Sequence, residues 1–427
     1  MKHSSRIALI LAGICSQAPS IAQAAEVLRT EHADLDVNGR FQLLGQGEHV
    51  PSAFRDTNRM YLFLNQARLS LSGRYDEITF RLELGMGGEA TLKAPNPGVS
   101  LGLLDMYVDL PLHALGSTRL RVGQFKVPYS RERLAYSANL PFALRSIQDL
   151  GFRMGRDVGA TLHTYVGEGV VAFGVFTGGG RDVPQRYLPE TLGFPMLVAR
   201  IGLNHGYDDD VFAAHYRLAH PDHTTGAVFV NGFYTRDTII GHSSVLNVRL
   251  EENSLLTDAG WNPYLASTPM THGQLWQVGG DAVVETPMGD GALSVEGEVN
   301  YGGFDNTAGS LRLFGGRLQG GYRTDCWGVA LRYAMLLPDK RFAVGATPIT
   351  GSGAMQEVTP ALTFFLNEHA KVILDLPLLF GSPVVTEPKI GSYVLADMPG
   401  QTSVLKNGGS VARETVVQGR ILFQATF

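Results

Sequence analysis

The feature that most constrains this chain is a two-residue alternation of apolar and polar residues that recurs along its length. It is present over 67–72, 78–85, 104–110, 293–300 and 327–335. Successive side chains of a β-strand point to opposite faces, so each segment is predicted to be a strand with one apolar and one polar face. No stretch approaches the ~18 consecutive apolar residues that a membrane-spanning helix needs. The sequence therefore predicts an all-β protein.

The alternation leaves open which face of each strand lies inside. In a soluble sandwich the apolar faces form a core, whereas in an outer-membrane barrel they face lipid and the polar faces line a lumen. Long connections such as 46–59 and 87–102 alternate with short ones such as 74–76 and 111–117. That pattern is typical of such barrels. Only 18% of the residues are charged, against ~25% in average proteins, which favours a surface that faces lipid.

The first 24 residues have the organisation of a secretory signal peptide. Lys2 and Arg6 form a basic start, residues 7–15 are apolar or small, and Ala24 ends a small-x-small cleavage site. The alternative is a membrane anchor, but this apolar run is too short to cross ~30 Å of hydrocarbon. A lipoprotein is disfavoured because Cys15 lies within the run. We therefore expect a signal peptide at 1–24, Sec-dependent export and a location in a Gram-negative-type outer membrane.

The end of the chain and the strand count fit a closed barrel. Alternate residues from Ile421 to Phe427 fall on one face of a strand that runs to the last residue. A closed sheet leaves no unpaired backbone edge in lipid. We count eighteen strands, including 211–219 and 239–249, and an even number places both termini on the periplasmic side. Residues 25–427 are thus predicted to form a single transmembrane antiparallel β-barrel with long external loops and short periplasmic turns.

The segment 119–180 carries the most specific motif of the sequence. A strand ends in Gly-x-x-Lys-x-Pro-aromatic-Ser, an Arg-Ser pair follows, and Gly-Arg-Asp-x-Gly begins the next strand. The residues that form these motifs are Gly123, Lys126, Pro128, Tyr129, Ser130, Arg145, Ser146, Gly155, Arg156, Asp157 and Gly159. This pattern resembles the phosphate-selective porin O and P family. That family usually has an acidic residue before the Arg-Ser pair, where this chain has Leu144.

The resemblance implies a 16-stranded barrel that assembles as a homotrimer, so 16–18 strands are expected. It also implies that residues 127–156 form the third external loop, folded inward to constrict the pore. The loop composition agrees with this, because its five arginines outnumber Glu132 and Asp149 and because it holds buried-type residues such as Leu134 and Phe142. The five arginines are Arg131, Arg133, Arg145, Arg153 and Arg156. The alternative is a surface loop whose arginines face lipopolysaccharide.

Further basic residues are expected on the polar, lumen-facing side of the strands. If Leu120 and Val122 face lipid, Arg119 and Arg121 project into the lumen. The same phase makes Arg68, Arg81, Arg200, Arg217, Arg312 and Arg332 lumenal. Carboxylates share these polar faces, namely Glu83, Asp105, Asp109, Glu296, Glu298 and Glu357. Lys126 falls out of phase, and we expect a bulge at Gly123 to turn it into the pore.

These observations predict a passive diffusion channel for small hydrophilic solutes with a preference for anions such as phosphate or polyphosphate. Rings of Arg or Lys favour anions, and guanidinium binds phosphate through two parallel hydrogen bonds. The residues expected to set selectivity are Lys126, Arg145, Arg119, Arg121, Arg131, Arg133, Arg156, Arg68 and Arg81. The expected partners are small anions, outer-membrane lipid and further copies of the chain.

Two other functions remain open at this point. A barrel hydrolase is disfavoured because no G-x-S-x-G motif is present, and His163, His215 and His220 are more simply satisfied polar groups. A non-selective, structural or adhesive barrel could use the long loops 250–272 and 381–413. No enzyme activity, cofactor or metal site is predicted. A formal net charge of −5 argues against nucleic acid as a partner.

Overall fold

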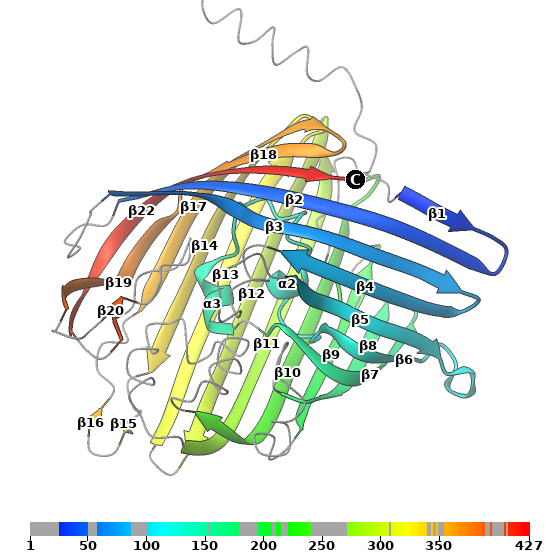
Figure 1. Cartoon of the computed structure of the whole chain (residues 1–427), viewed down its shortest axis with the longest axis horizontal. Coiled ribbons are helices and arrows are strands. Elements are labelled where there is room, and N and C mark those ends of the chain that lie inside the picture. The colour runs from blue at the N-terminus through cyan, green and yellow to red at the C-terminus, as the bar shows by residue number, and fades with distance from the viewer. Residues whose placement is uncertain are drawn as a thin grey trace, which may run out of the picture.

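The computed structural model describes most of the chain after the expected signal peptide. The described residues are 25–49, 58–86, 101–152, 154–178, 195–206, 211–214, 221–240, 271–306, 309–339, 343–344, 347–348, 354–388, 393–394, 405–406 and 409–427. They form one large antiparallel sheet that is rolled into a barrel, with short helices inside it (Figure 1). The signal peptide predicted at 1–24 lies outside the described residues.

The first half of the sheet runs from the N-terminus to the middle of the chain. Its strands are β1 (Ala25–Arg29), β2 (Ala33–His49), β3 (Asn58–Tyr75), β4 (Ile78–Met86), β5 (Gly102–Pro111), β6 (Arg119–Lys126), β7 (Arg156–Val166), β8 (Gly169–Phe176), β9 (Met196–His205) and β10 (Thr225–Ile240). Each strand from β2 to β10 pairs antiparallel with the next. β1 pairs with the first residues of β2, at the end of the barrel where the connections are short. It is not counted among the strands of the barrel wall.

The second half closes the barrel. Its strands are β11 (Thr271–Met288), β12 (Gly291–Asn306), β13 (Gly309–Arg323), β14 (Trp327–Asp339), β17 (Met355–Asn367), β18 (Ala370–Asp375), β19 (Leu378–Pro388) and β22 (Gly409–Thr426). Two-stranded ribbons, β15 (Ala343–Val344) with β16 (Thr347–Pro348) and β20 (Tyr393–Val394) with β21 (Leu405–Lys406), lie outside this sheet. β22 pairs with β2 along Arg40–His49, so the last strand closes onto the first.

The barrel has sixteen strands within the described residues. β18 and β19 count as one, because both pair with β17 and β22 and are separated only by Leu376 and Pro377. Proline lacks the N–H that a ladder needs, which accounts for the interruption. The all-β transmembrane barrel is therefore confirmed. The strand number is that of the resemblance and not our count of eighteen.

The two surplus strands were wrong for an identifiable reason. β9 pairs directly with β10, with His205 opposite Gly226, so no barrel strand lies between them. The described residues 211–214 of the segment expected to be a strand are irregular, and Val211 is fully buried inside. Likewise Ile240 continues β10 opposite Thr271 of β11. Residues 241–249 lie outside the described part of the chain.

The strand faces have the polarity of a membrane barrel. On β12, Val295 and Val299 are 47% and 54% exposed, whereas Glu296 and Glu298 are 1% and 2% exposed. Apolar side chains therefore cover the outer surface and polar ones point into the lumen. β8 differs, because its inward residues Val170 and Phe176 are also apolar and buried. Residues packed inside the barrel account for that exception.

The two ends of the barrel differ in their connections. The short connections 76–77, 112–118, 167–168, 289–290, 324–326 and 368–369 lie at one end, together with the C-terminus. Short turns mark the periplasmic end of barrels of this kind. A 3₁₀ turn, His113–Leu115, occupies one of these connections. Among the described residues no helix is long and apolar enough to traverse a bilayer.

Candidate functional site: a basic cavity in the lumen

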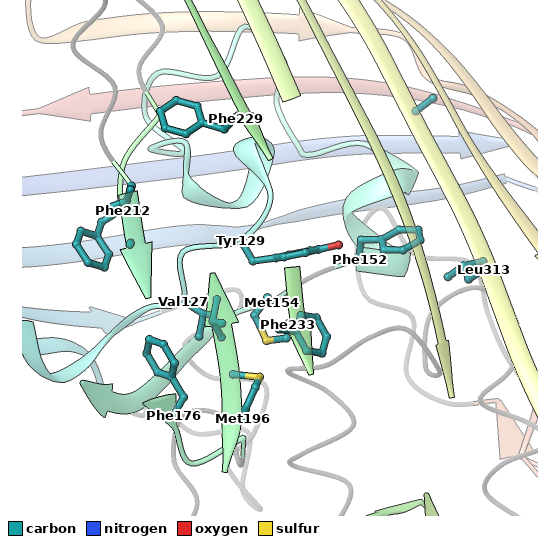
Figure 2. Close-up of a cluster of buried hydrophobic side chains, with 14 of the residues drawn as sticks. Val127, Tyr129, Phe152, Met154, Phe176, Met196, Phe212, Phe229, Phe233 and Leu313 are labelled. Atoms are coloured by element: carbon teal, nitrogen blue, oxygen red, sulfur yellow. The ribbon is translucent and has the colours of Figure 1, made fainter. Parts of the chain in front are cut away.

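The connection between β6 and β7 lies inside the barrel. It contains two short helices, α2 (Arg131–Leu134) and α3 (Ile147–Phe152), and α3 contacts β13, β14 and β17. Figure 2 shows Tyr129 and Phe152 of this connection among buried side chains of the barrel wall. The ring of Tyr129 meets that of Phe233 edge-on at 5.4 Å. The apolar residues noted in the sequence therefore pack against the inner wall.

Close packing here depends on glycine. Gly315 of β13 faces this connection, and a Cβ at that position would lie 2.5 Å from the ring of Phe152. The hydroxyl of Tyr129 donates to Oδ1 of Asn300 on β12 at 2.8 Å. Burial raises the pKa of that hydroxyl well above its ordinary value, so it remains a donor. These contacts fix the connection against the β10–β13 side of the wall.

Glu132 of α2 is the centre of a buried cluster of charged residues that we call the anchor. Its members are Arg131, Glu132, Glu296, Glu298, Arg317, Arg332 and Glu357. Its carboxylate lies 3.3 Å from Arg317 of β13 and 3.7 Å from Arg332 of β14. It also accepts hydrogen bonds from N and Oγ of Ser146, at 2.8 and 2.6 Å. The backbone N–H of Glu132 donates to Glu298 at 3.0 Å. Glu132 thereby ties α2, the Arg-Ser pair and the opposite wall together.

Arg131 belongs to the same anchor. It is 1% exposed and lies 3.1 Å from Glu296 and 3.8 Å from Asp281. Arg332 donates to Glu357 and, at 3.0 Å, to the carbonyl of Leu144. Wall carboxylates that the sequence placed in the lumen are therefore paired with arginine.

Seven basic side chains gather in a cavity of about 100 Å³ on the other side of this connection. They are Arg68, Arg81, Arg121, Lys126, Arg133, Arg145 and Arg156, and all seven are among the nine selectivity residues predicted from sequence. Asp105 is the one acidic residue among the described lining residues. Of the other two, Arg131 is in the anchor, and Arg119 binds Asp109 and the carbonyl of Glu77 near a periplasmic turn.

Lys126 and Arg145 are held by main-chain carbonyls. Nζ of Lys126 donates to the carbonyl oxygen of Leu134 at 2.6 Å, and Arg145 donates to those of Glu132 and Ala135 at 3.0 and 2.9 Å. Within the described part of the chain, neither forms an ion pair with a carboxylate. A carbonyl is a neutral acceptor, so within the described residues neither side chain is paired directly with a carboxylate.

The side chain of Lys126 points inward, but not through the expected bulge. β6 keeps a continuous register with β5 and with β7. Gly123 instead adopts φ +137°, which lies in the region that favours glycine. A Cβ there would lie 2.2 Å from the carbonyl oxygen of Met106. Lys126 therefore faces the lumen in a strand that has no inserted residue. The unusual backbone conformation at Gly123 lies just before this change in the face to which the side chains point.

The carboxylates near the cavity are each shared among arginines. Glu83 lies 2.9 Å from Arg68, 2.7 Å from Arg81 and 3.4 Å from Arg156. Arg156 also binds Asp105 through two nitrogens, at 2.7 and 2.9 Å. On the periplasmic side, Asp109 binds Arg119 and Arg121 at 3.0 and 2.8 Å. Basic groups therefore exceed acidic ones around the cavity.

Aromatic rings complete the cavity wall. Arg121 lies between two of them, 4.2 Å from the ring centre of Tyr107 and 3.7 Å from that of Phe212. Tyr136 is contacted by Arg81 and Lys126, at 5.3 and 5.1 Å. Burial raises the pKa of Tyr136 to about 12, so its hydroxyl is neutral at physiological pH.

Sequence reasoning missed these rings and one arginine. Phe212 gave no signal, because 211–219 was interpreted as a barrel strand. Arg40 lies directly opposite Arg68 in the β2–β3 register. The alternation of Arg40 and Gln42 with the outward-facing Phe41 could have placed it in the lumen.

A larger space of about 810 Å³ adjoins the basic cavity, and we call it the vestibule. Its lining includes Thr324, Asp325, Glu368 and His369, which place it at the periplasmic end. Arg68, Arg81 and Tyr136 line both spaces. The basic cavity is therefore at the inner end of the vestibule.

The remaining predicted lumenal arginines lie elsewhere. Arg200 binds Asp281 at 2.8 Å, and Arg312, a quarter exposed, binds Asp305 at 2.7 Å. Arg153 and Arg217 lie outside the described residues. Among the residues that the structure describes, no cluster of three or more His, Cys, Asp or Glu side chains could hold a metal ion.

Comparison with known structures supports the fold. The chain is similar to OmpT, an outer membrane protein of Vibrio cholerae (9% identity, 94% of this chain and 100% of that one, TM-score 0.54). It is also similar to an anion-selective porin from Comamonas acidovorans (12%, 92% and 100%, 0.52) and to the outer membrane channel DcaP of Acinetobacter baumannii (10%, 94% and 99%, 0.51). At such identities these similarities concern the fold alone.

Comparison of the sequence identifies the family. No curated protein matches the chain. The family model described as phosphate-selective porin O and P matches residues 52–375, which include β3 to β18 and all the residues that line the basic cavity. The chain belongs to the phosphate-selective porin O and P family, and it forms an outer-membrane channel for small solutes.

Proposed function

We propose that this channel favours small anions and that the basic cavity is its selectivity region. The observation that carries the proposal is the pair Lys126 and Arg145, whose side chains line the cavity and donate to main-chain carbonyl oxygens. Positive charge in a narrow, poorly hydrated space acts more strongly than in bulk water. Anions entering from the vestibule would therefore be stabilised and cations repelled.

The carboxylates of the lumen do not oppose this preference strongly. Glu296, Glu298 and Glu357 are engaged by Arg317 or Arg332 in the anchor. Glu83 and Asp105 are bound by arginines of the cavity itself. A carboxylate that is paired with an arginine contributes little net electrostatic potential at a distance from the pair. The connection 127–156, which the anchor holds inside the barrel, would then act as the pore constriction.

Phosphate is one anion that such a cavity would bind. Arginine offers a planar pair of donors that matches two phosphate oxygens. The family to which the chain belongs supports this choice. OmpT of Vibrio cholerae, a similar barrel with TM-score 0.51, has a trimeric form. We accordingly propose a lipid-embedded homotrimer, exported by the Sec pathway after cleavage of residues 1–24.

The reversal potential across a KCl gradient in a planar bilayer tests the preference. An anion-favouring channel shifts the zero-current voltage toward the chloride equilibrium potential. Millimolar phosphate should also reduce the chloride current. A reversal potential shifted toward the potassium equilibrium potential would contradict the proposal. Absence of conductance would favour a structural or adhesive barrel.

A further inference from the structure

The middle of the inward connection forms part of the boundary between the basic cavity and the vestibule. Tyr136 lines both spaces, Ser137 lines the cavity, and residues 138–142 line the vestibule. Segment 137–140 carries no charged side chain. It therefore has to be held in place by something other than the ion pairs of the anchor.

A row of inward-facing side chains on three adjacent strands meets this segment. Gln42 of β2 lies directly opposite Gln424 of β22, and Gln424 lies opposite Lys371 of β18. None of these residues is more than 8% exposed. Because β22 is the strand that closes the barrel onto β2 (Figure 1), the row crosses the seam of the barrel.

The amides of this row form a directed chain of hydrogen bonds. Nδ2 of Asn65 donates to Oε1 of Gln42 at 2.9 Å, and Nε2 of Gln42 donates to Oε1 of Gln424 at 2.7 Å. Nε2 of Gln424 then donates to the carbonyl oxygen of Ala138 at 3.1 Å. Each glutamine accepts with its oxygen and donates with its nitrogen, so the chain runs in one direction and ends on the inward connection.

A β-bulge supplies the first donor of this chain. The register between β2 and β3 shifts after Gln42, which leaves Asn65 without a residue opposite it on β2. Asn65 and Gln66 are adjacent, yet they are only 8% and 7% exposed. A bulge re-aims side chains in this way. Gln66 also contacts the segment, because it accepts a hydrogen bond from Oγ of Ser137 at 2.9 Å.

Lys371 and its strand hold the far end of the segment. Nζ of Lys371 donates to the carbonyl oxygen of Leu140 at 3.3 Å. Further along β18, Asp375 accepts from the backbone N–H of Ala143 at 2.9 Å. Leu140 is 4% exposed, and a buried carbonyl that loses its donor is destabilised. The bonds from the wall therefore favour one position of the segment.

We propose that Gln42, Gln424 and Lys371 are positioning residues that hold segment 137–140 against the closing wall and thereby set the width of the passage between the basic cavity and the vestibule. This inference rests on the proposed constriction at 127–156 and assigns to it residues outside that connection. The passage takes its final width only when β22 pairs with β2 in register, because a slip of one residue would turn these side chains to the other face.

Exclusion of neutral polymers tests the width directly. Poly(ethylene glycol) that enters a channel in a planar bilayer lowers its conductance, and an uncharged polymer reports width and not charge. Gln424→Met keeps the length of the side chain but removes both of its hydrogen bonds. Larger polymers should then enter, and the proportion of time spent in a level of larger conductance should rise roughly 5-fold for one lost hydrogen bond.

Gln46→Met is the matched control. Gln46 lies on the same strand and the same face as Gln42 and is 3% exposed. Among the described residues, neither polar atom of its side chain has a hydrogen-bond partner. The control should keep the wild-type polymer cut-off. A wild-type cut-off in Gln424→Met, or an equal shift in Gln46→Met, would overturn the inference.

Lys371 provides a second, independent pair of variants that decides the matter if Gln424→Met does not assemble. Lys371→Met removes the donor to Leu140 and should admit larger polymers. Lys371→Arg keeps both a donor and the charge, and it should exclude the polymers that the wild-type channel excludes. Equal cut-offs in these two variants would contradict a positioning role for Lys371.

Two measurements on the same variants separate the inference from other effects. A lower temperature of unfolding in detergent with an unchanged cut-off would indicate a role in stability alone and would overturn positioning. Reversal potentials report on the proposed anion preference. A wild-type channel that prefers potassium would contradict that preference, whereas a shifted cut-off in Gln424→Met would still support positioning.

Discussion

Lys126 and Arg145 both donate a hydrogen bond to the carbonyl oxygen of Ala135, at 3.4 and 2.9 Å. The two residues are nineteen positions apart, one at the end of β6 and one before α3. A single carbonyl thus brings two positive charges to the same wall of the cavity. Because like charges repel, this arrangement needs the surrounding anchor to hold it.

Removing both charges should weaken anion selectivity. In the double variant Lys126→Gln/Arg145→Gln, both charges are removed while an amide hydrogen-bond donor is kept at each position. The chloride-to-potassium permeability ratio should fall at least ~3-fold, given the strength of charge interactions in low dielectric. Reversal potentials measure this. Arg312→Gln is the control, since Arg312 is bound to Asp305 away from the cavity, and an equal effect there would contradict the assignment.

Breaking the anchor should widen the pore. Glu132→Gln removes one of the buried carboxylates around Arg317 and Arg332, which keep Glu296, Glu298 and Glu357, at a cost of ~1–3 kcal/mol. We expect larger and noisier single-channel currents, together with a lower temperature of unfolding in detergent. Glu77→Gln provides the control, because the side chain of Glu77 is 63% exposed and its carboxylate lies 3.3 Å from His113 at a periplasmic turn, away from the anchor. Wild-type conductance in Glu132→Gln would show that the connection does not depend on this carboxylate.

Substitution of Gly123 should impair folding of the β5–β6–β7 region. Alanine at this position must adopt φ +137° and would bring its Cβ 2.2 Å from a backbone oxygen. Strain of this kind costs about 1–3 kcal/mol, and relief would displace Lys126. The yield of heat-modifiable barrel from Gly123→Ala measures the effect. Gly47→Ala is the matched control, because a Cβ at Gly47 meets nothing within 4 Å.

The last residue should matter for assembly. Phe427 exchanges two backbone hydrogen bonds with Gly39 of β2, at 3.0 and 3.1 Å, and its side chain is 60% exposed at the periplasmic rim. Aromatic residues are favoured at membrane interfaces, so Phe427→Asp should reduce the amount of barrel in the outer membrane. Phe427→Tyr retains the ring and should assemble normally. Equal yields of the Asp and Tyr variants would argue against an interfacial anchor.

The basic cavity was only partly accessible to sequence reasoning. Arg131 and Arg145 lie in the same connection and look equivalent in sequence. Arg131 pairs with Glu296, which is 165 positions away, whereas Arg145 faces the cavity. The strand expected over 211–219 placed Phe212 in the barrel wall, whereas the described residues 211–214 are irregular. Contacts between such distant segments depend on how the barrel closes and cannot be obtained from local spacing.

The sequence by itself determined the fold class and which face of each wall strand points to lipid. A strand with one apolar and one polar face is stable in a membrane only when its apolar face points outward to lipid. Every backbone group must also pair within a closed sheet. Tertiary structure decided the rest. It set the number of strands at sixteen, because pairing of β9 with β10 moves Phe212 from the wall into the lumen. It also decided which cations contact a carboxylate directly, because the partners of a buried charge are fixed by packing across the lumen and not by neighbours in the chain.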